Sequence, residues 1–184
     1  QDDLHLSKDA LRKALGAILC SAAQRRRHTG LTSMTIASSK AEVRGTSEAS
    51  LFASCAEAVT AAEKLLHLAK AGVRSTVAGS KGGLDAAQAA AHGLAWLATY
   101  VESLRQMLGW ARRMEAAQRY TEFERLLLTA AFGEYLAQIA GGIPMSQSET
   151  VRLASLGVAR ADIRSFEEEV GDLIDAGTSD KIKA

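Results

Sequence analysis

The chain has 184 residues, of which 47% are apolar and 23% are charged, so it is long enough to bury the core of one domain and is not typical of a disordered protein. Its formal net charge of +1 creates no field that would attract nucleic acid. No run of about 18 apolar residues predicts a membrane span. We therefore expect a folded cytoplasmic domain, with neither nucleic acid nor a membrane among its partners.

The two cysteines, Cys20 and Cys55, have no spacing that is typical of a metal site or a redox pair. So few cysteines fit a reducing compartment better than a disulfide-stabilised secreted protein. We expect both side chains to be buried as small apolar groups.

Helix is the expected conformation almost throughout the chain. Alanine is abundant, there is a single proline, and β-branched residues form no alternating runs. We predict an all-α fold, a bundle of about five helices with a central helical hairpin. Residues 1–80 would hold N-terminal helices with a flexible link, residues 84–175 the helical core, and residues 176–184 a frayed tail.

The N-terminal part should contain two helices. Ser7 can cap a helix that runs to about Arg27, and the Ser/Thr-rich residues 29–47 should form a mobile connection. Residues 10–41 hold no Asp or Glu, as in organelle transit peptides, although a surface helix that ends in arginines is the commoner case. Residues 48–70 repeat apolar side chains at helical spacing, with Gly72 as the expected stop and a flexible link over residues 73–83.

The third helix, capped by Asp85 and ending near Arg113, carries two apolar stripes. The first consists of Leu94, Leu97, Val101, Leu104, Leu108 and Ala111, and the second of Trp96, Tyr100, Met107, Trp110 and Met114. A helix that is apolar over so wide an arc must be covered on more than one side. It should be the central helix of the bundle, or it should pack on another domain.

A fourth helix should begin at Thr121, because Thr121 and Glu124 form a capping box. Its expected core face consists of Phe123, Leu126, Leu127, Ala130, Ala131, Leu136 and Ile139. The connection from the third helix is short, which predicts an antiparallel hairpin.

The stretch GEYLAQIAGGIPMSQSE, residues 133–149, is the least generic part of the chain. Its glycine pair and Pro144 should end the fourth helix, and Ser146 with Glu149 resembles a second capping box. A last acidic helix should cover about residues 162–175.

No catalytic, cofactor-binding or metal-binding constellation is evident. The four histidines have no metal-ligand spacing, and neither glycine pair matches a phosphate-binding loop. His92 could act as an acid or base, but a structural histidine is the commoner case. Glu134, Tyr135 and Gln138 form a polar set on an apolar helix, where they would line a cleft or hydrogen-bond across an interface.

Residues 90–157 also carry a family resemblance. The segments AHGLAW, TYVESLRQ and above all GEYLAQIAGGIPMSQSE resemble the helical amino-terminal extension found in the acyl-CoA dehydrogenase family, in the branch that oxidises methylsuccinyl-CoA to mesaconyl-CoA. The resemblance implies a parent flavoprotein of the ethylmalonyl-CoA pathway that uses FAD and passes electrons to an electron-transfer flavoprotein. In that family a glutamate removes the α-proton while the flavin accepts a hydride.

The resemblance concerns the helical appendage, not the catalytic unit, so no catalytic residue is assigned, Glu134 included. Our leading hypothesis is a non-catalytic N-terminal domain that packs on the acyl-CoA dehydrogenase catalytic domain, in cis or in trans. The alternative is a free-standing interaction module that forms a homodimer through the Trp96 and Trp110 face. A third hypothesis is that the chain alone transforms an acyl-CoA. The candidate interface or cleft residues are Trp96, Tyr100, Trp110, Glu134, Tyr135, Gln138 and Met145.

Overall fold

The computed structural model describes residues 37–183. The predicted helix over residues 7–27, and with it Cys20, lies outside the described residues. Contacts divide the chain into two units, residues 1–41 and residues 42–184, and the helical bundle is the second of these. The elements of the described residues are α2 (Ala37–Gly79), α3 (Gly83–Ala86), α4 (Gln88–Ala116), α5 (Glu122–Gly141), β1 (Ile143–Pro144), β2 (Thr150–Val151), the 3-10 turn η1 (Leu153–Leu156), α6 (Arg160–Thr178) and α7 (Asp180–Lys183).

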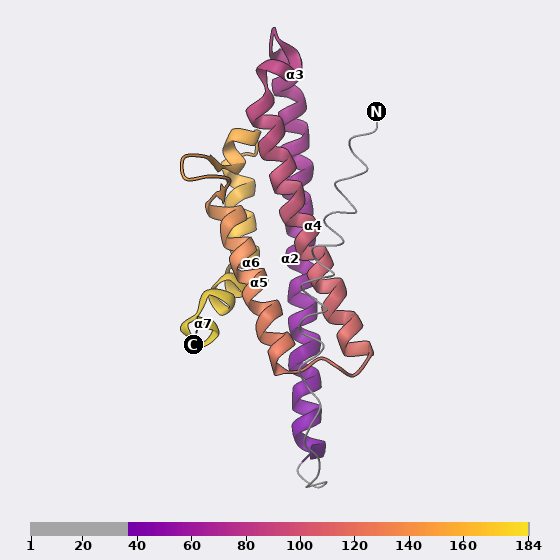
Figure 1. Cartoon of the computed structure of the whole chain (residues 1–184). Helices are drawn as coiled ribbons and strands as arrows, with labels where there is room; N and C mark the ends of the chain where they lie inside the picture. The colour runs from indigo at the N-terminus through magenta and orange to yellow at the C-terminus, as the bar shows by residue number, and fades with distance from the viewer. Residues whose placement is uncertain (1–36, 184) are drawn as a thin grey trace. The chain divides into compact units, whose positions relative to one another are not determined.

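The prediction of an all-α fold is confirmed, since four long helices account for most of the described chain. Within the second unit, α4 runs back along α2, α5 runs back along α4 and α6 lies beside α5 (Figure 1). The predicted hairpin of the third and fourth helices is therefore present. No helix in residues 37–183 combines the length and the apolar character that crossing a bilayer requires.

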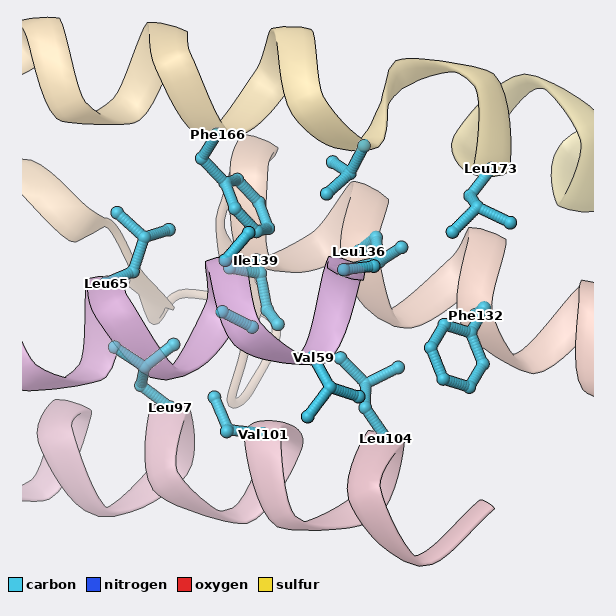
Figure 2. Close-up of a cluster of buried hydrophobic side chains, with 14 of the residues drawn as sticks. Val59, Leu65, Leu97, Val101, Leu104, Phe132, Leu136, Ile139, Phe166 and Leu173 are labelled. Atoms are coloured by element: carbon cyan, nitrogen blue, oxygen red, sulfur yellow. The ribbon is translucent and has the colours of Figure 1, made fainter. Parts of the chain in front are cut away.

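The core lies where α2 meets the other three long helices. In Figure 2, Val59 and Leu65 of α2 lie between the side chains of α4 and those of α5 and α6. The buried side chains facing α2 include Leu97, Val101, Leu104, Leu128, Phe132, Leu136, Ile139, Phe166 and Val170. Burying so many large apolar groups in one cluster is the main stabilising contribution to the bundle.

Helix α2 is longer than the sequence predicts at both ends. It already includes residues 37–47, which we had assigned to a mobile connection, and it continues past Gly72 through residues 73–79. Gly72 does not stop the helix: a Cβ there would lie 2.2 Å from the carbonyl oxygen of Leu156, so glycine permits close packing against η1. Val73 is buried and continues the core face, and the Thr76 hydroxyl is satisfied by the Gly72 carbonyl, 3.1 Å away.

The predicted cap at Asp85 is wrong. Asp85 lies inside the one-turn helix α3, and α4 begins after Ala87, which has no capping side chain. Ala87 is buried, and its carbonyl accepts the N–H of Ala91 at 3.0 Å, so packing and backbone hydrogen bonds start this helix.

The capping box of α5 is confirmed, with the backbone N–H of Thr121 donating to the Glu124 carboxylate at 2.8 Å. The predicted core face is wrong in part. Phe123 and Leu127 are 53% and 40% exposed. The side chains that α5 buries are those of Leu128, Thr129, Phe132, Leu136 and Ile139. The sequence pattern was ambiguous because α5 is apolar around most of its circumference.

The stretch after α5 forms a small β-hairpin, so the second capping box is wrong. Ile143 pairs with Val151 and Pro144 with Thr150, antiparallel. The Ser146 hydroxyl accepts the N–H groups of Ser148 and Glu149 at 3.3 and 3.2 Å, so it stabilises the turn and caps no helix.

Helix α6 extends three residues beyond the predicted end, and its last turn packs closely on α5. A Cβ added at Gly177 would lie 2.3 Å from the carbonyl oxygen of Thr129 and 2.6 Å from the Cα of Gly133. The two helices therefore meet backbone to backbone. Residues 176–178, which we predicted to fray, are part of this contact.

Replacing Gly177 with alanine should destabilise the bundle by about 1–3 kcal/mol, because the methyl group overlaps the backbone of α5. Thermal unfolding followed by circular dichroism measures the change. Gly171→Ala is the matched control on α6, since a Cβ there meets no other atom within 4 Å. We expect the control to be stabilised slightly, by about 0.5–1 kcal/mol, and equal melting temperatures for the two variants would contradict the packing described.

Candidate functional site

The aromatic residues that the sequence singled out on α4 lie beside the core rather than within an open site. Trp96, Tyr100, Met107 and Trp110 are half-buried and pack against the buried cluster. The other stripe of α4 is buried from Leu97 to Ala111, and its first member, Leu94, is half-buried. The two stripes predicted for this helix therefore have different environments.

Tyr100, Tyr135 and Gln138 come together between α4 and α5. The Tyr100 hydroxyl donates to Oε1 of Gln138 at 2.5 Å, and the Tyr100 and Tyr135 rings lie 4.7 Å apart between centroids. Burial, and then the neighbouring Tyr135, raise the pKa of Tyr100 above its ordinary value. A neutral phenol that donates to an amide is suited to joining two helices.

Glu134 does not belong to this group. It is exposed, whereas Tyr135 and Gln138 are half-buried. The polar set that the sequence suggested is therefore divided between two faces of α5. Two of its members join the helices, and the third faces solvent.

Trp96 is held by His92 one turn earlier on α4. The indole Nε1–H donates to Nε2 of His92 at 2.9 Å, and both side chains contact solvent. An imidazole that accepts a hydrogen bond at Nε2 carries its proton at Nδ1. His92 therefore acts here as a positioning partner of the indole.

The β-hairpin covers a cleft of about 500 Å³ next to the first turn of α4. Met145, the remaining candidate residue, lines this cleft together with His92, Ser148 and Glu149. Gly93 forms part of the wall, where a Cβ would come within 3.0 Å of Val151. The lining contains no Lys or Arg, so the cleft supplies no cation for a phosphorylated cofactor such as FAD.

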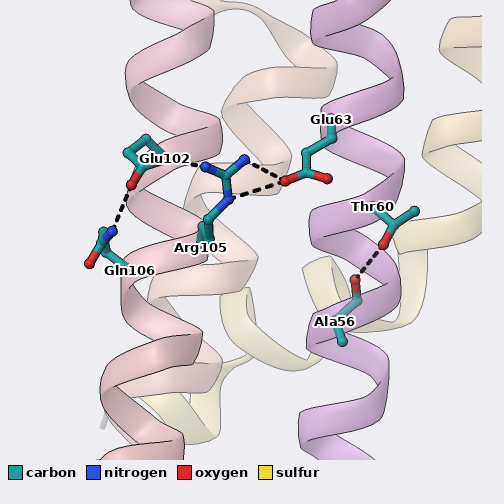
Figure 3. Close-up of polar contacts among 6 residues, drawn as sticks. All are labelled: Ala56, Thr60, Glu63, Glu102, Arg105 and Gln106. Carbon is teal, nitrogen blue, oxygen red and sulfur yellow. Dashed lines mark hydrogen bonds and ion pairs between the residues drawn. The ribbon is translucent and has the colours of Figure 1, made fainter.

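Ion pairs centred on Arg105 join α4 to α2 (Figure 3). Arg105 donates through Nε to Glu63 of α2 at 3.1 Å and through Nη1 to Glu102 at 2.6 Å. The three side chains are 42–53% exposed, so these pairs contribute modestly to stability.

Helix α5 carries a mostly apolar stripe on its outer side, away from the core. Phe123, Leu127, Ala130 and Glu134 follow one another in steps of four, three and four, which places them on one helix face. We call this set the outer stripe. Its helical spacing was visible in the sequence, but it was assigned to the core.

The outer stripe of α5 lies at the same height along the helix axes as the half-buried residues Trp110 and Met114 of α4. The helices are antiparallel, and Tyr100 meets Tyr135 and Gln138. At 1.5 Å per residue on both helices, this contact places Trp110 level with Leu127 and Met114 level with Phe123. We call the outer stripe together with Trp96, Met107, Trp110 and Met114 the α4–α5 outer face.

Cys55 lies in the core of the bundle near Tyr120. Burial raises the pKa of its thiol from 9.0 to about 12, despite the opposing charge of Arg112. The Tyr120 ring packs edge-on against Phe52, with centroids 5.1 Å apart. Among the described residues, no three His, Cys, Asp or Glu side chains form a cluster that could hold a metal ion.

Tyr100→Phe should destabilise the protein by about 1 kcal/mol, because it leaves Gln138 without its hydrogen-bond donor. Tyr135→Phe is the matched control: it keeps the ring pair, and no described residue hydrogen-bonds to the Tyr135 hydroxyl. Chemical denaturation of both variants measures the difference. A loss of stability in the control that equals the loss in Tyr100→Phe would contradict the role given to the hydroxyl.

The thiol of Cys55 should be inert in the native state. In a Cys20→Ala background at pH 8, labelling with a disulfide reagent should be about 1,000-fold slower than in denaturant, because each unit of raised pKa lowers the thiolate population tenfold. Absorbance of the released thiol follows the reaction. Equal rates with and without denaturant would show that Cys55 is accessible.

Comparison with known proteins confirms the resemblance predicted from the sequence. The chain is 46% identical over 132 residues, 70% of its length, to (2S)-methylsuccinyl-CoA dehydrogenase of Cereibacter sphaeroides. The matched region spans 24% of that enzyme, so the similarity is to about a quarter of it. No protein-family model matches the chain.

Proposed function

We propose that this chain is a helical, non-catalytic domain of an FAD-dependent acyl-CoA dehydrogenase that converts methylsuccinyl-CoA to mesaconyl-CoA, and that it packs on the catalytic unit. The 46% identity to (2S)-methylsuccinyl-CoA dehydrogenase supports the relationship. Because the matched region is a quarter of that enzyme, we assign the chemistry to the remaining three quarters. An N-terminal position and a cytoplasmic location stay predictions.

The observation that carries this proposal is the outer stripe, which the described residues leave exposed. Two adjacent large side chains, Phe123 and Leu127, are 53% and 40% exposed one turn apart. Leu126, Ala130 and Ala131 beside them are half-buried, so this side of α5 is apolar over several turns. A helix that is apolar on all sides is normally buried on all sides, and a contiguous exposed apolar surface is typical of an interaction site.

The α4–α5 outer face is also aromatic, a composition that favours a protein partner. Trp96 and Trp110 retain solvent contact while their rings rest on the core. Indole rings pre-positioned in this way lose little conformational entropy when a partner covers them, and tryptophan is enriched at the energetic centres of interfaces. We assign this face to the catalytic unit, in cis or in trans.

A catalytic role for the described residues finds no support in their chemistry. The hairpin cleft is lined by Glu149 and by no Lys or Arg, so it offers no basic side chain to a flavin pyrophosphate. Glu134 is exposed on the outer stripe, so we do not assign it the role of a base. FAD, the acyl-CoA site and the electron-transfer flavoprotein partner belong, in this proposal, to the unmatched part of the enzyme.

A chimera tests the proposal. The matched 132 residues of the Cereibacter sphaeroides enzyme would be replaced by those of this chain, with a protease site at each junction. We expect the chimera to fold with flavin. After cleavage, the helical domain should still elute with the flavin-containing part in gel filtration, because the outer stripe is buried between them.

Phe123→Asp with Leu127→Asp should release the helical domain after cleavage, because two carboxylates cannot be buried against an apolar surface. Leu84→Asp is the matched control, since Leu84 on α3 is 58% exposed and lies outside the outer face. It should leave the complex intact. Retention of the double variant, or release of the unsubstituted domain, would contradict docking through this face, and homodimers of the free chain would favour the alternative of a self-associating module.

A further inference from the structure

The outer stripe contains one charge, and its position restricts what can cover it. Glu134 follows Phe123, Leu127 and Ala130 on the same face of α5, and the next positions along the face are Ala137 and Gly141. No other described residue forms a hydrogen bond or ion pair with Glu134. A lone carboxylate therefore lies within an otherwise apolar stripe.

The helix itself cannot neutralise this carboxylate. The residues one turn away are Ala130, Ala131, Ala137 and Gln138. The first three have no polar side chain, and Gln138 carries no charge and is held to Tyr100 of α4 through its Oε1. While the face is exposed, water solvates Glu134. Once a partner covers the face, that solvation is lost, and an unpaired carboxylate would oppose binding strongly.

We propose that Glu134 determines the specificity and register of docking, and that the surface covering the outer stripe presents an arginine or lysine to it. This inference rests on the proposed function. A guanidinium is the better match, because it binds a carboxylate through two parallel hydrogen bonds and is more easily desolvated than an ammonium group. The partner surface is therefore apolar with one cation opposite α5.

A second copy of this chain is the competing partner for this face. The α4–α5 outer face is formed by Trp96, Met107, Trp110, Met114, Phe123, Leu127, Ala130 and Glu134, and none of these is a cation. Arg125, the nearest basic residue on α5, donates to Glu122 at 2.8 Å, away from the stripe. The exposed Arg113 and Arg119 lie at the loop end of the hairpin, so in a symmetric dimer they would have to reach the opposite end of the stripe to pair with Glu134. We assign the cation to the catalytic unit, and a homodimer of the free chain in gel filtration would contradict this assignment.

The cleaved chimera described above also tests this inference. Dilution followed by gel filtration gives the dissociation constant between the helical domain and the flavin-containing part. Glu134→Lys should raise this constant by about 100-fold or more, and Glu134→Gln by about tenfold, because a buried cation loses its counter-charge. In Glu134→Gln the dissociation constant should also depend less on salt concentration.

A matched control separates a specific pair from general electrostatics. Glu167→Lys reverses an exposed charge on α6, outside the outer face, and should leave the dissociation constant unchanged. Thermal unfolding of the free chains checks that all variants fold, which is expected because both positions are exposed. If Glu134→Lys and Glu134→Gln bind like the unsubstituted domain while Phe123→Asp with Leu127→Asp is released, the role of Glu134 is wrong and the proposed function stands. If all of them bind equally well, both proposals fail.

Discussion

The backbone contact between Gly133 and Gly177 determines how α5 can be used. Because neither residue has a side chain, α6 approaches α5 so closely that a Cβ on Gly177 would overlap the Thr129 carbonyl. With α6 on this side, Phe132 and Leu136 face the core. Tyr100 then fixes α4 on the next side through Gln138. Within residues 37–183, one side of α5 has no helix against it, and that side carries the outer stripe.

Helix α4 shows why a wide apolar arc did not by itself identify the docking surface. Its inner stripe is buried, and part of its second stripe is used within the domain, where Tyr100 contacts α5 and Trp96 is held by His92. The sequence predicts that α4 packs against neighbours on two sides, and within the domain α5 is the neighbour on much of the second side. The most exposed large apolar side chains of the hairpin, Phe123 and Leu127, belong to α5. The proposed interface is therefore shared by both helices.

The sequence was sufficient to predict the helical class, the antiparallel hairpin and the Thr121 capping box, because each depends on local propensity or spacing. It was insufficient where a residue serves a distant contact. Gly72 resembled a helix stop but permits packing against η1, which follows it by more than 80 residues. The buried face of α5 was predicted incorrectly in part for a related reason. Because α5 is apolar around most of its circumference, its sequence does not show which side faces the core.

For the candidate site, too, the sequence identified individual residues but not the contacts between distant ones. The sequence singled out the aromatic and polar residues, but only the fold shows that Tyr100, Tyr135 and Gln138 meet while Glu134 faces outward. Hydroxyl-radical footprinting of Phe123 in the free chain and in the assembled chimera tests the central claim most directly. The account predicts rapid oxidation of Phe123 in the free chain and strong protection in the assembled enzyme, with the rate at Leu84 unchanged. Equal oxidation of Phe123 in both would contradict it.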